Sequence, residues 1–363
     1  MNGDWKKYFR LENKFFVEYS EDISSTPPSI AIIPMLCNVL PMAWALDAEI
    51  IIDELDKDFY DHVDEIKRGY IDMYPRMKLE GLLTVGKIVD NSYEPTERSL
   101  LLFSGGVDAF SSLITHAAEH PTLMTIYGSD ISLDDQIGWT RVEKHVREVG
   151  AEFGCENLFI KSSFRKFLNE GLLTRFVKPY CDDGWWHDFQ HGIGLLGHAA
   201  PYAFKHRLKY IYIASSFTAT YRITCASDPT IDNHLAVASC RTIHDGYEFT
   251  RQDKVHRICT YRSETGRAIR LRVCWKSKGG KNCCRCEKCW RTIIGIYAER
   301  NDPKTFGFDY DDWDGLMRLM QENQKEFEYH KNARYAPIVR AMRKNYRRDE
   351  IPSELLWFYD MKF

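Results

Sequence analysis

The sequence predicts an α/β fold built on a parallel sheet, because strand-like and helix-like stretches alternate through the middle of the chain. Apolar runs at Leu100–Phe103, Leu123–Tyr127, Leu158–Ile160 and Tyr210–Ala214 are typical of buried strands. Strand, helix and parallel strand form right-handed units, and open sheets of this kind bind ligands beyond the carboxyl ends of their strands. We therefore expect the functional residues just after these runs.

A length of 363 residues is long for a single domain. We expect a small α+β domain at residues 1–97, a catalytic domain at 98–300 and a helical tail at 301–363. The net charge of −3 argues against a surface that binds nucleic acid generally. The sequence shows neither a signal-peptide pattern nor a run long enough to cross a bilayer, so we expect a cytoplasmic protein with no membrane partner.

The sequence of the front segment predicts strands at Ser29–Ile33 and Glu49–Ile52, on either side of a helix-like apolar run. Pro41 is expected to kink or interrupt that run. Gly81–Lys87 matches most of a Walker A pattern, but Ile88 stands where Ser or Thr must ligate Mg²⁺. We therefore interpret Gly81–Lys87 as a strand and not as a phosphate site.

The central motif follows the first sheet strand and opens a helix-like stretch. Two adjacent glycines let the backbone approach a ligand closely, and the first amides of a helix lack internal partners and carry positive potential. A phosphate is the expected ligand, and a carboxylate in such a loop can hold the Mg²⁺ of a nucleotide. The alternative is an ordinary Gly-Gly turn before a capping Asp. The motif consists of Ser104, Gly105, Gly106, Val107 and Asp108.

This motif resembles that of the PP-loop ATP pyrophosphatase family, whose fingerprint is Ser-Gly-Gly-x-Asp-Ser. The resemblance implies a Rossmann-like parallel sheet and an enzyme that splits ATP between its α and β phosphates and transfers AMP to a substrate oxygen. Ala109 stands where the family has Ser, and Ser111 or Ser112 could supply the missing hydroxyl.

Four further residues are predicted near ATP because they end or follow the second, third and fourth strands: Tyr127, Gly128, Lys161 and Ser215. For Lys161, a solvated lysine at a strand end is an equal alternative. Thr250 can cap a helix that begins with Arg251 and Lys254. Family resemblance implies that Lys254, and after it Arg251, lies near the departing pyrophosphate, whereas a solvated helix face is the alternative for Arg251.

The polar stretch from Phe217 to Ser239 is long for a connection, and such loops tend to be functional. We predict a substrate loop, with Arg222 as partner of a carboxylate or phosphate and with Asp228 and Asp232 beside it. A simple connector is the alternative. His187 and His191 have the spacing of a metal pair, but no third ligand follows, so we favour a packed helix there.

Eleven cysteines do not indicate a secreted disulfide framework. Four of them form the pattern Cys-x8-Cys-x2-Cys-x2-Cys, namely Cys274, Cys283, Cys286 and Cys289. Thiolates at this spacing can surround one tetrahedral Zn²⁺ with no open position, which indicates a structural role. Cys284 could replace Cys283, and an iron–sulfur cluster would also take four thiolates.

The loop, the sheet and the late cysteine knuckle at 274–289 together resemble the 7-cyano-7-deazaguanine synthase family, over about Ser99 to Ile296. The resemblance implies that ATP, with Mg²⁺, activates a small-molecule carboxylate such as 7-carboxy-7-deazaguanine, and that ammonia then gives an amide or nitrile. Relatives in bacterial antiviral systems imply a second outcome, conjugation to an amine of a partner protein. The resemblance covers neither the front domain nor the tail.

A homodimer is also expected. Two alternative functions remain. The first is a tRNA-base-modifying enzyme whose tail, in which basic and aromatic residues are mixed, would bind RNA. A solvated amphipathic helix is the commoner explanation of such a tail. The second is an ATP-binding scaffold without turnover, for which Ala109 is the local hint. Nucleophilic chemistry by Cys181, Cys225 or Cys240 is disfavoured, since the sequence ties no base to them.

Overall fold

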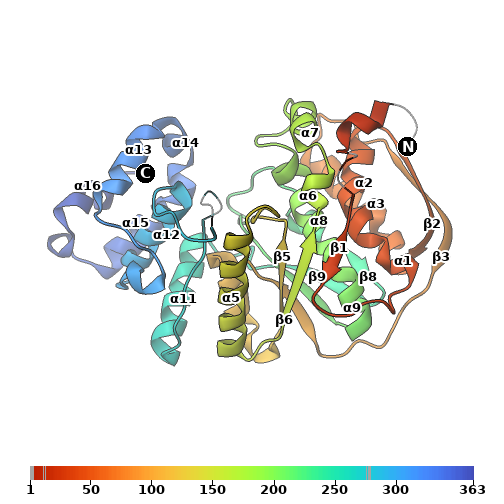
Figure 1. Cartoon of the computed structure of the whole chain (residues 1–363). Helices are drawn as coiled ribbons and strands as arrows, with labels where there is room; N and C mark the ends of the chain where they lie inside the picture. Colours follow the sequence, from red (N-terminus) through yellow and green to blue (C-terminus); the bar gives the residue numbers. More distant parts are fainter. Residues whose placement is uncertain (1–3, 11, 13, 275, 277–278) are drawn as a thin grey trace.

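The computed structural model describes residues 4–10, 12, 14–274, 276 and 279–363. Its main feature is a curled, mostly parallel sheet of seven strands in the order β1-β6-β5-β4-β7-β9-β8 (Figure 1). The five central strands are parallel to their neighbours, while β1 and β8 pair antiparallel at the two edges. The strands are β1 (Val17–Tyr19), β4 (Ser99–Leu102), β5 (Thr122–Tyr127), β6 (Asn157–Ser162), β7 (Tyr210–Ala214), β8 (Ala236–Val237) and β9 (Cys240–Asp245). The predicted α/β class is confirmed.

Strand β4 lies at the centre of this topology. From β4 the chain steps outward on one side to β5 and β6, then returns to the other side for β7 and β9. Leu101 of β4 pairs with Leu123 of β5 and with Tyr212 of β7. Such a reversal of strand order leaves a crevice at the carboxyl end of the central strand, where ligands of open α/β sheets bind.

Helices cover both faces of the sheet, because neighbouring residues of each buried strand point to opposite sides. Leu100 faces one apolar core and Leu101 the other. The first core contains α2 (Ile33–Ala45), α3 (Lys57–Met73), α8 (His191–Leu196) and α9 (Ala200–His206). The second contains α4 (Val107–Thr115), α5 (Gln136–Phe153), α11 (Arg251–Thr265) and α12 (Glu287–Ala298).

The front segment shares the first of these cores. Strand β1 pairs with β6, and α2 and α3 pack with side chains of the large sheet. Strands β2 (Glu49–Asp56) and β3 (Leu82–Val89) form a separate parallel pair, which confirms the strand interpretation of Gly81–Lys87. One core contains side chains from both sides of residue 97, among them Leu40 and Leu100, so the front segment packs against the sheet.

The strand predicted at Ser29–Ile33 is wrong. Ser29–Ile33 is helical, in α1 (Pro28–Ala31) and the start of α2, because Pro28 and Pro34 sit at first-turn positions that favour helix starts. Pro41 lies inside α2 without ending it. Almost every side chain of α2 is buried, and that packing offsets the roughly 3 kcal/mol that an internal proline costs.

The stretch predicted as one helix between Trp185 and Phe204 is divided into shorter pieces. A π-helical turn, η3 (Trp186–Gln190), precedes α8, and the 3-10 turn η4 (Gly197–Ala199) separates α8 from α9. The shorter helices before it are α6 (Phe164–Phe167) and α7 (Glu170–Val177), and α10 (Pro229–Asp232) lies within the predicted substrate loop. Single π turns are frequent at functional sites.

The tail forms α13 (Asp314–Glu322), α14 (Gln324–Arg334), α15 (Ala336–Asn345) and α16 (Leu356–Tyr359). Several of its basic side chains contact acidic groups or carbonyls of the chain itself: Arg334 pairs with Glu287 and Glu326, and Arg343 donates to the Tyr359 carbonyl. Within the described residues, none of the helices combines the length and the apolar character needed to cross a bilayer.

Candidate functional site

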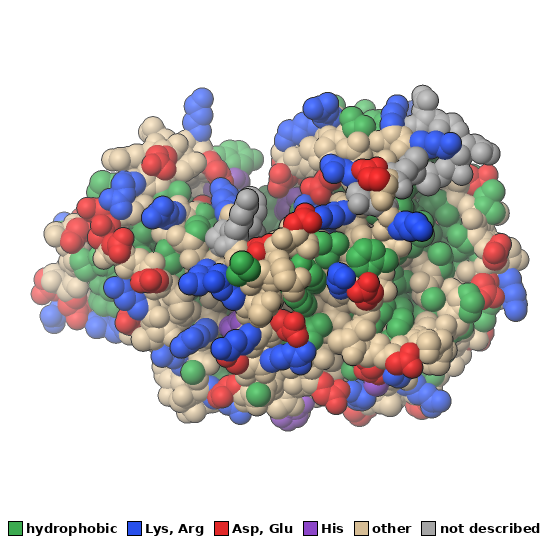
Figure 2. All heavy atoms as spheres, viewed as in Figure 1, with side chains coloured by type: hydrophobic (Ala, Val, Ile, Leu, Met, Phe, Trp, Pro, Cys, Tyr) green, Lys and Arg blue, Asp and Glu red, His purple; other side chains and the backbone are tan. Residues whose placement is uncertain are grey.

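A cavity of about 1290 Å³ separates the carboxyl edge of the sheet from the tail helices. Figure 2 shows the opening as a hollow between the two halves of the molecule. Three regions contribute its walls: the Asp108 loop with the starts of α11 and α12, the segment from Arg165 to Cys225, and α13 to α15 of the tail. The tail is therefore a wall of the cavity. A smaller cavity of about 160 Å³ adjoins it under the loop and shares Asp108, Asp130 and Lys288 with it.

The Ser104–Asp108 loop leads from β4 into α4 at the predicted position. Gly105 has φ +77°, a conformation that favours glycine, and a Cβ there would lie 3.1 Å from His145 Nε2. Arg272 fixes the loop, since its backbone N–H donates to the Gly105 carbonyl at 2.7 Å and its Nε to the Ser104 carbonyl at 3.0 Å. Gly106 caps α4 without a side-chain bond, which leaves the first-turn amides available to a ligand.

Asp108 lies beside two cations from the first turn of α11. Arg251 Nη1 is 2.9 Å from Asp108 Oδ2, and Lys254 Nζ is 3.6 Å from Oδ1. The start of α11 is well defined, because Thr250 forms a capping box with Asp253. Lys254 also donates to the Ser215 carbonyl at 2.5 Å. The structure thus brings together the three residues that the sequence analysis assigned to catalysis.

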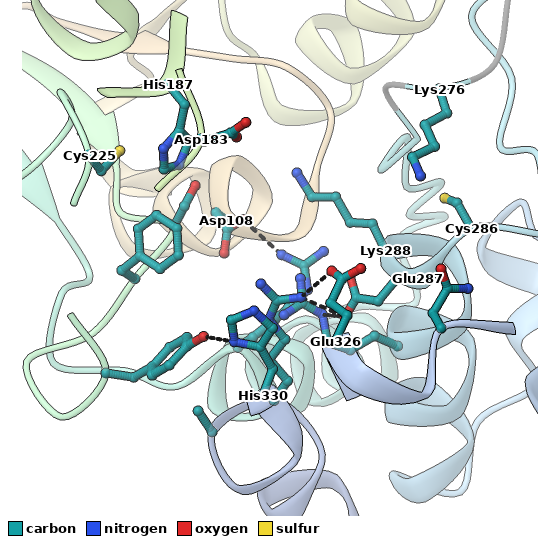
Figure 3. Close-up of a pocket in the computed structure, with 18 of the residues that line it drawn as sticks. Asp108, Asp183, His187, Cys225, Lys276, Cys286, Glu287, Lys288, Glu326 and His330 are labelled. Carbon is teal, nitrogen blue, oxygen red and sulfur yellow. Dashed lines mark hydrogen bonds and ion pairs between the residues drawn. The ribbon is translucent and has the colours of Figure 1, made fainter. Parts of the chain in front are cut away.

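The N-terminus of α12 brings further cations that the sequence analysis missed. Lys288 extends into the cavity near Asp108 (Figure 3). Arg291, one turn later, also lines the cavity and pairs with Glu287 at 3.3 Å. The α4, α11 and α12 helices all begin at this cavity, so their dipoles add positive potential there. Close to Asp108 the cations therefore outnumber the carboxylates, which suits an anion, while several acidic side chains line the rest of the cavity.

The pKa values of these side chains are shifted by burial and by the charges that lie close together here. Burial raises the pKa of Asp108, but Arg251 and Lys254 outweigh it and hold that pKa below its usual value. Burial lowers the pKa of Arg251, of Lys254 and of Lys288, while Asp108 acts in the opposite direction on each. Asp108 is therefore a carboxylate, and the cations around it are costly to keep charged without a further anion.

Several residues predicted near ATP lie elsewhere. Lys161 is at the sheet edge, 3.2 Å from Glu18 of β1, and does not line the cavity. Ser111 faces α11, where its hydroxyl accepts from Arg257 Nη1 at 3.3 Å, and it does not line the cavity.

Three more of these residues support the site without lining it. Tyr127 is buried and stacks on Trp139 with ring centroids 4.7 Å apart, while Gly128 turns the chain after β5 with φ +107°. The hydroxyl of buried Ser215 donates to the Phe217 carbonyl.

The residues predicted to bind substrate pair with other side chains of the protein. Arg222 makes a two-pronged ion pair with Asp228, at 2.9 and 3.0 Å. Asp232 is buried and accepts from Ser227 Oγ, and its Oδ2 lies 2.8 Å from His244 Nδ1. None of Arg222, Asp228 and Asp232 lines the cavity. These contacts hold the loop in its shape. Oppositely charged side chains that are close in the sequence can pair with each other where the fold shields them from water.

The cavity wall opposite the tail carries residues with no local sequence signal. The π turn η3 places Trp186 and His187 on this wall, and the Arg165 guanidinium lies 4.1 Å from the Trp186 ring centroid. Tyr221 of the loop reaches across to the tail, where its hydroxyl is 2.5 Å from His330 Nδ1 (Figure 3). Both predicted histidines, His187 and His191, line the cavity, although the sequence analysis favoured packing for them.

The four predicted cysteines converge on one centre at the edge of the cavity. All four sulfurs lie within 4.8 Å of one another, and the Cys274–Cys286 and Cys283–Cys289 pairs are each 3.9 Å apart. Zinc–sulfur bonds of about 2.3 Å in a tetrahedron separate the sulfurs by roughly 3.8 Å. The cluster can therefore hold a metal such as zinc. Cys284, with φ +51°, lies outside it, so the choice of Cys283 is confirmed.

Comparison with known proteins gives no assignment. No protein-family model matches this chain, and no curated protein matches it significantly. What the cavity can bind and do is therefore inferred from its own residues.

Proposed function

We propose that this protein is an ATP-dependent adenylating enzyme of the PP-loop type, which converts ATP to AMP and pyrophosphate while activating a carboxylate. The observation that carries this proposal is the surplus of cations around Asp108. Arg251, Lys288 and Arg291 line one cavity with Asp108 of the glycine loop, Lys254 lies behind Asp108 at 3.6 Å, and three helices begin there. A chain of phosphates would offset this charge.

The two adjoining cavities suit the two parts of a nucleotide. Apolar side chains, among them Leu102, Ile126 and Val142, line the smaller cavity together with the loop, and this is where adenosine would lie. The larger cavity would take the phosphates and still leave space for a second substrate, since drug-sized ligands occupy about 300–1,000 Å³. Strand order agrees with this placement, because ligands bind at the point where the order reverses.

In the proposed reaction, an oxygen of the substrate carboxylate attacks the α-phosphorus and pyrophosphate departs. Arg251 and Lys254 are positioned to stabilise the charge that develops on the leaving group, and Lys288 approaches it from α12. Asp108 and Asp130 are the carboxylates shared by both cavities and would hold Mg²⁺, which neutralises phosphate charge when bound.

The cysteine cluster is proposed to hold structural Zn²⁺. Four thiolates leave no open position for chemistry. Cys286 caps α12 and Cys289 lies in its first turn, on either side of Lys288. A metal bound there would fix the start of α12 and with it the position of Lys288.

The first substrate to test is 7-carboxy-7-deazaguanine, which family resemblance suggests. The adenylate would react with ammonia to give an amide or nitrile, or with an amine of a partner protein, as in antiviral relatives. A tRNA base as substrate and a scaffold without turnover are the competing outcomes.

The experiment incubates purified protein with MgATP and this carboxylate, with and without ammonia, and separates the nucleotide products. AMP and pyrophosphate from the native chain, lost in Arg251→Met, support adenylation. Lys161→Met is the matched control, because Lys161 lies at the sheet edge and should keep activity. ADP as the product would overturn the α-phosphate reaction, and ATP binding without AMP would favour the scaffold.

A further inference from the structure

The cavity wall carries a cysteine and a histidine that the proposed adenylation does not use. Cys225 and His187 both line the large cavity. Figure 3 shows the Cys225 sulfur directed toward the His187 ring on the wall opposite Lys288. The two segments are tied together, because the Ala226 N–H donates to the His187 carbonyl at 2.9 Å.

A buried carboxylate lies beside His187. Asp188 Oδ2 is 3.8 Å from His187 Nδ1, which is too far for a hydrogen bond, so the two groups interact through their charges, and the Asp188 side chain is fully buried. The backbone N–H of Gly184 donates to the same carboxylate oxygen at 2.9 Å, which keeps it fixed and ionised. Burial lowers the pKa of His187, but Asp188 and Cys225 more than compensate, so its pKa lies above the usual value. A proton that has passed to His187 is therefore held there at neutral pH.

The contacts and place of Cys225 differ from those of two other thiols in the chain. The Ser227 N–H donates to the Cys225 sulfur at 3.4 Å. Burial raises the pKa of Cys181 and of Cys240 to about 12. Neither of those thiols lines the large cavity, so they provide internal standards for reactivity.

We propose that Cys225 is a catalytic nucleophile that receives the acyl group from the adenylate as a thioester, with His187 as its base and Asp188 as a positioning residue. This proposal rests on the proposed adenylation. The cavity that holds Asp108 and its cations also contains the thiol, so an acyl-adenylate can meet it without leaving.

The step balances without a further reactant. The thiol proton passes to His187, the sulfur bonds to the carbonyl carbon, and the bond from that carbon to AMP breaks. The nitrogen of an amine then attacks the thioester and the carbon–sulfur bond breaks. His187 returns its proton to the sulfur, takes up the proton that the amine loses and releases that proton to solvent, which restores the starting state. The products are AMP and an amide.

The test has two parts. In the first, full-length protein is incubated with MgATP and 7-carboxy-7-deazaguanine without an amine, and AMP and intact protein mass are measured together. The expected result is AMP plus a protein adduct of the carboxylate less one water. Hydroxylamine should remove the adduct, Cys225→Ala should lack it and Cys181→Ser should keep it. AMP without an adduct on Cys225 would overturn the thioester and leave adenylation standing.

The second part needs no substrate. Iodoacetamide labelling at pH 7, followed by peptide mass spectrometry, compares Cys225 with Cys181 and Cys240 in the same chain. Cys225 is expected to react at least about tenfold faster, and His187→Gln should remove most of that advantage. If no AMP forms, the protein does not adenylate this carboxylate, and the labelling result alone tests whether Cys225 is a nucleophile. Equal labelling of the three cysteines would overturn the nucleophile.

Discussion

Replacing Asp108 by Asn should both destabilise the protein and strengthen its binding of pyrophosphate. Asp108 is only 13% exposed and lies 2.9 Å from Arg251 and 3.6 Å from Lys254. Removing one partner of a buried ion pair costs about 3–5 kcal/mol. Unfolding entropy of about 2.1 cal/mol/K per residue gives roughly 0.76 kcal/mol/K for 363 residues, so 3 kcal/mol corresponds to a Tm lower by about 4 °C.

Binding of pyrophosphate should restore much of the stability that the Asp108→Asn variant loses. Without the carboxylate, the cations of α11 and α12 are neutralised less and attract an anion more strongly. A tenfold gain in affinity is worth about 1.4 kcal/mol, or about 2 °C more stabilisation than the native chain gains from the same ligand. The assay is thermal unfolding in Mg²⁺-free buffer, with and without inorganic pyrophosphate.

Asp228→Asn is the matched control, because Asp228 also forms a close ion pair, with Arg222, but does not line the cavity. The control should lose stability and gain no more from pyrophosphate than the native chain does. The reasoning is refuted if Asp108→Asn unfolds at the native temperature, or if pyrophosphate stabilises both variants equally.

The remaining predictions concern the cavity, the metal and pH. Lys288→Met should lower AMP formation by about 10²–10³-fold with little loss of stability, whereas Lys161→Met should leave the rate unchanged in the same assay. Cys286→Ser should reduce the metal content measured by mass spectrometry and lower Tm, while Cys284→Ser should retain full metal, because Cys284 lies outside the cluster. Burial lowers the pKa of His116, but Asp245 and Glu119 raise it above 6.5 overall. Its contribution to stability is therefore complete below about pH 6.5 and is lost as pH rises through the higher folded pKa, so urea unfolding of His116→Gln should show a flatter pH dependence there.

The sequence predicted the parts of the site that depend on local patterns. The glycine loop, the cap before Arg251 and the cysteine spacing each specify geometry within a few residues, and all three are found as expected. Strand positions were also predictable, because fully buried strands are continuous apolar runs. From these features the sequence predicted that Asp108, Arg251 and Lys254 lie together.

The prediction failed where the outcome depends on contacts distant in the sequence. Lys161 follows a strand as expected, but β1 adds to that sheet edge and supplies Glu18 as its partner. A local pairing was also not foreseen: Arg222 and Asp228 are only six residues apart, and the polar character of the loop does not distinguish side chains that face a ligand from side chains that pair with each other. Lys288 gave no signal of its own, since only the docking of α12 on α11 brings it near Asp108.

The wall formed by α13 to α15 also bears on the order in which the cavity is assembled. Translation delivers the glycine loop long before the tail, and Tyr221 has no His330 to contact until α14 has been made. A nascent chain that lacks the tail therefore exposes its cationic pocket to solvent on one side, and docking of the tail encloses it. A chain cut before α13 should keep its sheet but leave this cavity open to water.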